Sequence, residues 1–259
     1  MNKILTISGS DSCGGAGIQA DIKAASSRHD YVSSVIVSVV AENTMGLKDM
    51  VNMPKELVEN QIAAVFEDMG ADAVKLGMLP SKEIIEAVSN SLSKYQVKNV
   101  VFDPCMVNKS DDEFVKDDSI DVLKDKIFEL VDLICPNIPE AKTITGIKIE
   151  NVDQMKEACK IIYEMGVKNV LLKGGSDIGA LDIFYDGKEF TEFRSEKIDS
   201  KNTWGSGDVL AMIIASNLAK GLEMKEAIKD AKNYVTEAIK QAPLIGKGFG
   251  VLEFDPKLK

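Results

Sequence analysis

The regular alternation of short apolar runs with longer amphipathic segments constrains the fold of this chain more than any other feature. Six apolar runs read as buried strands, at 4–7, 34–40, 73–76, 99–102, 133–135 and 169–172. Helical patterns lie between them, at 18–27, 54–69, 81–95, 119–130 and 152–165. Strands that alternate with helices form βαβ units around a parallel sheet. The pattern therefore predicts an α/β protein with a mainly parallel central sheet.

The pattern changes after Gly175. Runs at 180–185 and 189–193 flank the dipeptide Asp186-Gly187, which predicts a small β-hairpin added to the sheet. Two further helices are expected over 207–220 and 225–241. No Pro- or Ser-rich linker interrupts the 259 residues, so we expect one domain over residues 1–259.

Charge and composition exclude several classes of function. The formal net charge of −10 argues against a nucleic acid or an anionic membrane as partner, because both attract a basic face. An anionic substrate stays compatible, since a phosphate site needs only a local cluster of N–H groups and a lysine or two. His29 is the only histidine, which excludes Ser-His-Asp triads, His-based zinc sites and a histidine general base.

The cysteines and the N-terminus indicate a cytoplasmic protein. The four cysteines include no C-x-x-C pair, which is typical of reduced thiols. The sequence enters a strand-like run at once, without the pattern of a signal peptide. No apolar stretch approaches the roughly 20 residues of a membrane span, so no membrane partner is expected.

The segment 201–208 carries the strongest chemical signal. Gly205, Ser206 and Gly207 precede an apolar helix, whose first turn offers unpaired N–H donors and the positive end of its dipole to a phosphate. Asp208 follows them and could take the proton from a hydroxyl that attacks that phosphate. The alternative is an ordinary Gly-rich loop that caps a helix.

Unusual residues also follow four predicted strands, at 8–17, 103–106, 136–140 and 173–175. Open parallel sheets bind ligands beyond the carboxyl ends of their strands. Asp103 and Glu140 could hold Mg²⁺ beside nucleotide phosphates. The alternative is that Asp103 caps a turn and Glu140 supports the N-terminus of a helix. Asn137 shares one side of a first helical turn with Glu140. Lys173 suits a phosphate, although a surface lysine at a strand exit fits the same pattern.

The first of these segments, 8–17, lacks the spacing of a dinucleotide fingerprint and the Gly-Lys-Ser/Thr ending of a Walker loop. Its glycines suit either close approach of the backbone to a ligand or a tight strand-to-helix turn. Asp21, in the helix that follows, is unremarkable when taken alone. The charged segment 109–118 is expected to be a solvated loop, with a lid as the second interpretation.

Together these segments resemble the ribokinase superfamily and, within it, the bacterial hydroxymethylpyrimidine/phosphomethylpyrimidine kinases of thiamine synthesis. The resemblance covers nearly the whole chain, from the opening string Leu5-Thr-Ile-Ser-Gly-Ser-Asp-Ser to Gly205-Ser-Gly-Asp208. The opening string is specific to this family and its pyridoxal-phosphorylating relatives. The second element is shared across the superfamily and supports kinase chemistry more than a particular substrate.

The resemblance implies a three-layer α/β/α ribokinase-like fold, a homodimer, and ATP with Mg²⁺. It implies phosphorylation of 4-amino-5-hydroxymethyl-2-methylpyrimidine on its hydroxymethyl group, and then of the resulting monophosphate. Residues 205–208 would form the anion hole, with Asp208 as base. The residues that would line the substrate pocket are Gly9, Asp21, Val40, Glu42, Met78 and Cys105. Those that would serve Mg²⁺ or the nucleotide are Asp103, Glu140, Asn137, Lys173, Gly175 and Thr203.

Four positions depart from the family pattern. The family usually has Cys at Asp208, whereas most of the wider superfamily has Asp there as base. Trp204 and Phe249 replace two family histidines, which keeps open a catalytically silent ligand-binding paralogue. Glu42 replaces a Gln whose amide can both donate to and accept from an aminopyrimidine, whereas an ionised carboxylate only accepts. That change keeps pyridoxal/pyridoxine (vitamin B6) kinase as an alternative.

Overall fold

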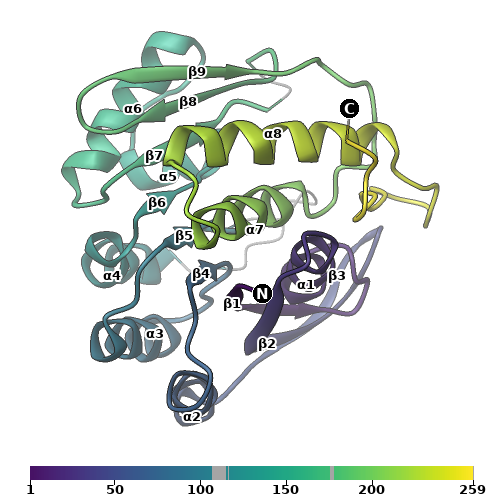
Figure 1. The fold of residues 1–259 in the computed structure, drawn as a ribbon. Helices are drawn as coiled ribbons and strands as arrows, with labels where there is room; N and C mark the ends of the chain where they lie inside the picture. Colours follow the sequence, from purple (N-terminus) through teal and green to yellow (C-terminus); the bar gives the residue numbers. More distant parts are fainter. Residues whose placement is uncertain (107–114, 116, 176–177, 259) are drawn as a thin grey trace.

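A nine-stranded sheet runs through the centre of the computed structural model, which describes residues 1–106, 115, 117–175 and 178–258 (Figure 1). The strand order is β3-β2-β1-β4-β5-β6-β7-β8-β9. Strands β2, β1, β4, β5, β6 and β7 run parallel, whereas β3, β8 and β9 join the two edges as antiparallel strands. The strands are β1 Lys3–Asp11, β2 Tyr31–Asn43, β3 Gly46–Asn52, β4 Ala73–Leu76, β5 Val100–Phe102, β6 Leu133–Ile134, β7 Val170–Lys173, β8 Leu181–Tyr185 and β9 Phe190–Arg194.

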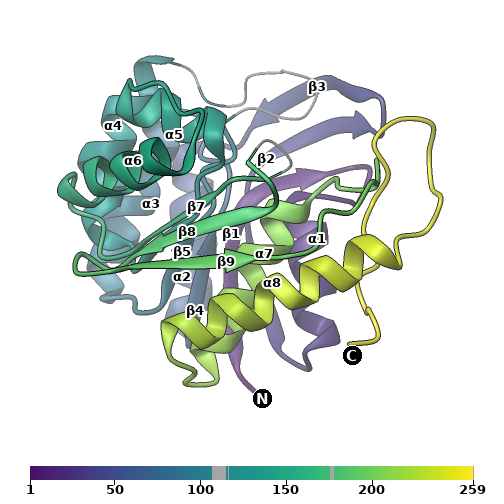
Figure 2. The same cartoon turned by 90° about the horizontal axis from the view of Figure 1, so that it is seen from above.

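Helices cover both faces of the sheet and complete a three-layer α/β/α fold, as the sequence predicts (Figures 1 and 2). One face carries α1 Gly17–Ser27, α7 Ser206–Ala219 and α8 Met224–Lys240. The other carries α2 Lys55–Phe66, α3 Lys82–Tyr95, α4 Asp117–Ile127, α5 Ile138–Thr145 and α6 Val152–Glu164. In the part of the chain that the structure describes, no helix is both long and apolar enough to cross a membrane.

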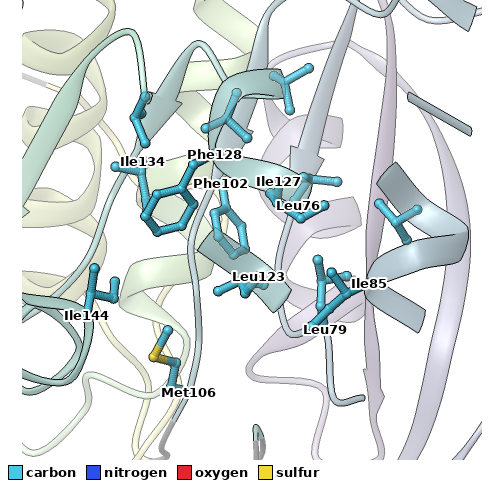
Figure 3. Close-up of a cluster of buried hydrophobic side chains, with 14 of the residues drawn as sticks. Leu76, Leu79, Ile85, Phe102, Met106, Leu123, Ile127, Phe128, Ile134 and Ile144 are labelled. Carbon is cyan, nitrogen blue, oxygen red and sulfur yellow. The ribbon is translucent and has the colours of Figure 1, made fainter. Parts of the chain in front are cut away.

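The larger of the two main apolar cores lies between the sheet and α2–α6 (Figure 3). Phe102 of β5 and Phe128, just after α4, are fully buried in it. Aliphatic side chains from α3, α4 and α5 surround these two rings, among them Ile85, Leu123 and Ile144. Truncation of a buried Phe to Ala typically costs about 3–5 kcal/mol of stability, so this core anchors the strands whose ends carry the pocket.

Helix α7 is buried on all sides, which fixes the position of its N-terminus. Every residue from Asp208 to Asn217 is buried. A helix that is apolar around its whole circumference belongs to an interior, and α7 lies between the sheet, α1 and α8 (Figure 2). The first turn of α7 is therefore held rigidly at the carboxyl edge of the sheet.

Most predicted elements lie where the sequence places them, but several need correction. Strand β2 extends beyond the predicted 34–40 at both ends, to Tyr31 and Asn43. Strand β1 continues past 4–7 to Asp11, because residues 9–11 pair with β2 after a bulge between Ser8 and Gly9. Strand β3 was not predicted, since its side chains are exposed or half-buried and show no apolar face. The helix predicted at 54–69 ends at Phe66. The one predicted at 119–130 divides into α4 and a 3₁₀ turn at Phe128–Leu130.

The hairpin after Gly175 is confirmed, with Gly187 at φ 85° in the turn between β8 and β9. Of the segment predicted as a solvated loop or lid, 109–118, residues 109–114 and 116 lie outside the described residues. Its last two positions belong to α4, which begins at Asp117.

Candidate active site

A pocket of about 810 Å³ opens at the carboxyl ends of β5, β6 and β7 and at the N-terminus of α7. This volume lies within the range of small-molecule sites. The structure brings most of the predicted site residues to its walls: Glu42, Asp103, Cys105, Asn137, Glu140, Lys173, Gly175, Thr203, Gly205, Ser206, Gly207 and Asp208. The other four, Gly9, Asp21, Val40 and Met78, do not line it and lie beneath or beside these walls.

The N-terminus of α7 presents free backbone donors to this pocket. Its N-cap residue, Gly205, has φ 75° and offers no side-chain cap. In the part of the chain that the structure describes, the N–H groups of Gly207 and Asp208 have no hydrogen-bond acceptor. Unpaired donors at the positive end of a helix dipole form an anion site. A β-carbon at Gly205 would lie 1.9 Å from the carbonyl oxygen of Gly15, so this close packing requires glycine.

Asp208 does not cap its own helix. Its Oδ1 lies 2.7 Å from Nζ of Lys75, which is fully buried at the end of β4. The same ammonium lies 2.9 Å from Oδ2 of Asp21, and this oxygen also accepts a 2.5 Å hydrogen bond from Thr6. Lys75 therefore joins α1 to α7 through one buried cation shared by two carboxylates.

The ionisation of this group follows from its isolation from water. Burial raises the pKa of Asp21 to about 7, against the opposing charge of Lys75. Burial alone would lower the pKa of Lys75, but the carboxylates of Asp208 and Asp21 outweigh it, and the pKa lies above its ordinary value. Lys75 is therefore a permanent cation in the protein interior.

Asp103 and Lys173 form a second ion pair on the pocket wall. Nζ of Lys173 lies 2.5 Å from Oδ1 of Asp103, and both side chains are mostly buried. Burial alone would lower the pKa of Lys173, but the charges of Asp103 and Glu140 raise it above its ordinary value. A β-carbon at Gly207 would lie 2.7 Å from Oδ2 of Asp103 and 3.1 Å from Nζ of Lys173. Glycine at this position lets the first turn of α7 approach the pair closely.

Glu140 and Asn137 form a capping box at the start of α5. The Asn137 side chain accepts from the Glu140 N–H, and the Glu140 carboxylate accepts from the Asn137 N–H, both at 2.8 Å. Glu140 also accepts from the N–H of Met106 at 3.2 Å. Burial raises the pKa of Glu140 to about 7. The cap interpretation of Glu140 is thus confirmed, and the carboxylate still lines the pocket beside Asp103.

The first Gly-rich loop is a tight turn in which the N–H groups of residues 12–16 are already hydrogen-bonded. The buried carboxylate of Asp11 accepts from the N–H groups of Cys13, Gly15 and Ala16 at 2.6, 2.9 and 2.8 Å. Ser12 ties the loop to the end of β2: its hydroxyl donates to the carbonyl of Glu42 and accepts from the Glu42 N–H. This loop therefore fixes neighbouring structure, and of its residues only Ala16 lines the pocket.

A small apolar cluster lies behind Cys105. Val40 and Met78 are buried against each other, with Cys105 packed on them. A β-carbon at Gly9 would lie 2.6 Å from Cε of Met78, so glycine makes room for this cluster. Burial raises the pKa of the Cys105 thiol well above its ordinary value, which keeps the thiol neutral.

Two aromatic residues occupy positions where the resembled family has histidine, and both line the pocket. Trp204 is buried against the first Gly-rich loop: a β-carbon at Gly15 would lie 2.9 Å from its Cδ1. Its Nε1 has no hydrogen-bond partner among the described residues. Phe249 is partly exposed, and its N–H donates to the carbonyl of Thr44.

Sequence reasoning missed Lys75 and Asp11. Lys75 stands in the otherwise apolar run Ala-Val-Lys-Leu of a strand buried on both faces. A lysine is almost never fully buried unless it is paired, so its place in this run was a usable signal. The partners, Asp21 and Asp208, are far away in sequence and give no local pattern.

Comparison with known proteins agrees with this geometry. Residues 11–253 match the model of the phosphomethylpyrimidine kinase family. The thiamine biosynthesis bifunctional protein ThiED of Geobacter sulfurreducens is 43% identical over 249 residues, which cover 95% of this chain and 51% of that protein. The chain thus spans about half the length of the bifunctional relatives that it matches.

Solved structures share the whole fold. A phosphomethylpyrimidine kinase from Clostridium difficile 630 is 42% identical with a TM-score of 0.83, covering 92% of this chain and 100% of that one. A pyridoxal kinase from Bacillus subtilis, solved as an ADP complex, is 35% identical with a TM-score of 0.93, covering 99% and 98%. Since the family model matches nearly the full length and these structures share the fold, the chain belongs to the phosphomethylpyrimidine kinase family.

Proposed function

We propose that this chain is an ATP-dependent kinase of thiamine biosynthesis that phosphorylates 4-amino-5-hydroxymethyl-2-methylpyrimidine and then its monophosphate. The observation that carries the proposal is the meeting, in one pocket, of the unpaired N–H groups of α7 with the Asp208 carboxylate. The family and its solved neighbours, one of them an ADP complex, support a nucleotide as co-substrate. All of residues 1–259 would act as one cytoplasmic kinase domain.

The proposed transfer needs a base, an anion hole and a cation. The substrate hydroxyl gives its proton to Asp208 while its oxygen bonds to the γ-phosphorus of ATP. The bond from that phosphorus to the β–γ bridging oxygen breaks, and ADP leaves. The N–H groups of Gly207 and Asp208 would bind the transferring phosphoryl oxygens, where negative charge shifts during the reaction.

The opposite wall would hold the nucleotide phosphates. Lys173 supplies a permanent positive charge there, and Asn137, Gly175 and Thr203 line the same pocket. Gly175 has φ 55°, and no atom of the described residues lies within 4 Å of the place of a β-carbon, so the backbone can approach a phosphate closely.

The carboxylates of Asp103 and Glu140 fit Mg²⁺. The described residues contain no cluster of three or more Asp, Glu, His or Cys side chains that would enclose a metal ion. Mg²⁺ needs no such cage, because it commonly takes one or two carboxylates and completes its shell with water and phosphate oxygens. When bound, it neutralises charge on the nucleotide phosphates. Asp103 and Glu140, both buried and facing the pocket, would hold it.

A homodimer is supported by apolar surface on the β2–β3 edge. Val39, Met45 and Val51 are all exposed there. Monomeric proteins rarely expose grouped large apolar side chains, and such patches mark interaction surfaces.

A vitamin B6 vitamer is the second candidate substrate. Glu42 lines the pocket in place of the family's usual Gln, and its carboxylate suits a phenol donor or a protonated ring nitrogen. The TM-score of 0.93 to a pyridoxal kinase agrees with this alternative.

Turnover measurements test the function. The full chain would be given ATP and Mg²⁺ with hydroxymethylpyrimidine, its monophosphate, pyridoxal, pyridoxine or ribose. We expect product from the first two substrates and none from ribose. Product from the pyridoxal forms alone would establish the B6 alternative. No product from any of them would favour a silent ligand-binding paralogue, for which Trp204 and Phe249 would be the reason.

A further inference from the structure

The buried cation Lys75 lies outside the roles assigned so far. It is fully buried, and its Nζ bonds two carboxylates that come from different helices, Asp21 of α1 and Asp208 of α7. A buried charge is costly unless it is paired and hydrogen-bonded. An apolar side chain would fill the same place at the end of β4 without that cost, so stability alone does not account for the lysine.

We infer that Lys75 is a positioning residue: it orients the Asp208 carboxylate for proton abstraction, and Asp21 keeps Lys75 paired while Asp208 becomes neutral. This inference rests on the proposed function, because it concerns the base of that reaction. It assigns no contact with substrate to Lys75.

The two oxygens of Asp208 have different surroundings. Oδ1 is bonded to Lys75 at 2.7 Å. Oδ2 has no hydrogen-bond partner among the described residues, and it is not one of the buried unpaired atoms, so it is open to the pocket. The bond at Oδ1 therefore sets the rotation of the carboxylate, and Oδ2 is the oxygen left to receive a proton.

Proton transfer changes the charge beside Lys75. Before transfer, the ammonium is shared by Asp208 and Asp21. Afterwards, the substrate proton resides on Oδ2, Asp208 is neutral, and the substrate oxygen is bonded to phosphorus. Lys75 still has the 2.9 Å contact to Asp21, whose Oδ2 is fixed by Thr6 at 2.5 Å. The buried cation thus keeps a counter-ion throughout the step.

The other groups around Lys75 do not replace this pairing. Asp103 adds attraction from the pocket wall, but its carboxylate is bonded to Lys173. Cys105 is neutral because burial raises the pKa of its thiol. Asp21 and Asp208 are therefore the carboxylates that control this ammonium.

A matched pair of variants tests the inference. Lys75→Met keeps the unbranched side chain up to the ε position and removes the cation, so Asp208 loses its orientation. We expect kcat to fall by about 10²-fold, the scale of a misplaced reacting group, with the KM for ATP little changed. The acid limb of the kcat profile should move to higher pH, because loss of the neighbouring cation disfavours the ionised form of the base. Lys220→Met is the control: Lys220 pairs with the buried Asp30 at the opposite end of α7 and should leave kcat unchanged.

A second variant keeps the test valid if Lys75→Met does not fold. Asp21→Asn combined with Lys75→Met removes the cation and one of its carboxylates together, so less uncompensated charge is buried. Its kcat should also fall by about 10²-fold. Wild-type kcat in a folded form of either variant would overturn the positioning role.

A measurement without turnover separates this inference from the proposed function. The protons of an ammonium sealed from water exchange slowly, so Lys75 should give an observable NH₃⁺ signal by ¹⁵N NMR. Asp208→Asn should shift that signal, and Lys220→Met should not. An unshifted signal would overturn the inference even if the kinase is active. A shifted signal in a protein that phosphorylates none of the substrates tested would reject the proposed function and leave the Lys75–Asp208 contact established.

Discussion

The chain contains two Gly-rich loops that each lead into a helix, and the structure uses them in opposite ways. In the loop before α1, the Asp11 carboxylate accepts from the N–H groups of Cys13, Gly15 and Ala16. The loop before α7 has no such acceptor, and the N–H groups of Gly207 and Asp208 stay open among the described residues. The first loop is a structural turn, whereas the second has open donors and is the anion site that we propose.

One acidic side chain makes the difference. In the first loop Asp11 precedes Gly14 and Gly15, and its carboxylate folds back to accept from the N–H groups of the residues that follow it. In the second, Asp208 follows the glycines and turns away to Lys75. The comparison shows that glycine content marks a close approach of backbone, whereas the position of the nearest carboxylate decides whether the donors are free for a ligand.

The largest expected effect tests the second loop. Asp208→Asn keeps the size of the side chain and loses its basicity, so kcat should fall by about 10²–10⁴-fold, the range of a positioned base. ATP binding should change little, because the α7 N–H groups remain. Steady-state kinetics with isothermal titration of ATP separates the two quantities. A near-normal kcat in a folded Asp208→Asn protein would exclude Asp208 as the base. This loop would then only begin a helix, as the first loop does.

The next effect tests the first loop. Asp11→Ala leaves three N–H groups without their charged acceptor, and we expect the free energy of unfolding to drop by about 3 kcal/mol. Urea unfolding measures the drop, and Asp11→Asn, which keeps one acceptor oxygen, should lose less. The kcat of the folded protein should be far less affected than by Asp208→Asn. A comparable loss of kcat would mean that both loops serve the reaction.

A smaller effect concerns the residue that the first loop holds in place. Ser12 fixes the backbone of Glu42, whose side chain lines the pocket. Glu42→Gln restores an amide donor, so it should keep or improve binding of an aminopyrimidine. If a B6 vitamer is the substrate, binding should weaken by about 1–3 kcal/mol. Titration calorimetry with an aminopyrimidine and with a B6 vitamer distinguishes the two substrates. Unchanged affinity for both would show that Glu42 does not contact the ring.

The smallest effect, taken per pH unit, concerns the link that Lys75 makes between α1 and α7. The pKa of Asp21 is raised from 3.8 to about 7, so between these values the folded state binds more protons than the unfolded state. Its free energy of unfolding therefore falls as pH rises through this window, by at most about 1.4 kcal/mol per pH unit from this group. Asp21→Asn should remove that slope.

Urea unfolding at several pH values measures the difference between wild type and Asp21→Asn. Glu140, whose pKa is also raised by burial, contributes equally to both proteins and cancels in the comparison. Identical pH profiles would show that Asp21 is not protonated in the folded state near neutral pH.

Local periodicity predicted the parallel strands, and the loops at strand ends located the pocket. The three layers and several further pocket residues came from the family resemblance. Sequence reasoning missed β3, whose exposed edge position removes the apolar alternation that identifies a strand. It ended β1 too early, because the small polar residues of the segment after Ile7 pair with β2 only in the folded sheet.

The buried ion network could not be read locally. Asp21 was unremarkable in its helix, and Lys75 was hidden in a short apolar run. Their contact joins residues 54 positions apart, and the contact of Lys75 with Asp208 joins residues 133 positions apart. Likewise, for each Gly-rich loop the sequence alone left a ligand site and an ordinary turn as alternatives, because which amides remain free depends on where the Asp11 and Asp208 side chains turn.

Trp204 gives the protein a built-in optical reporter. It is the single tryptophan of the chain, it is buried in the wall of the pocket, and it directly precedes the first glycine of the second loop. All tryptophan emission therefore originates at one known place, beside the proposed nucleotide site. Occupancy of the pocket can be followed by intrinsic fluorescence without a label, even in variants such as Asp208→Asn that bind without turning over.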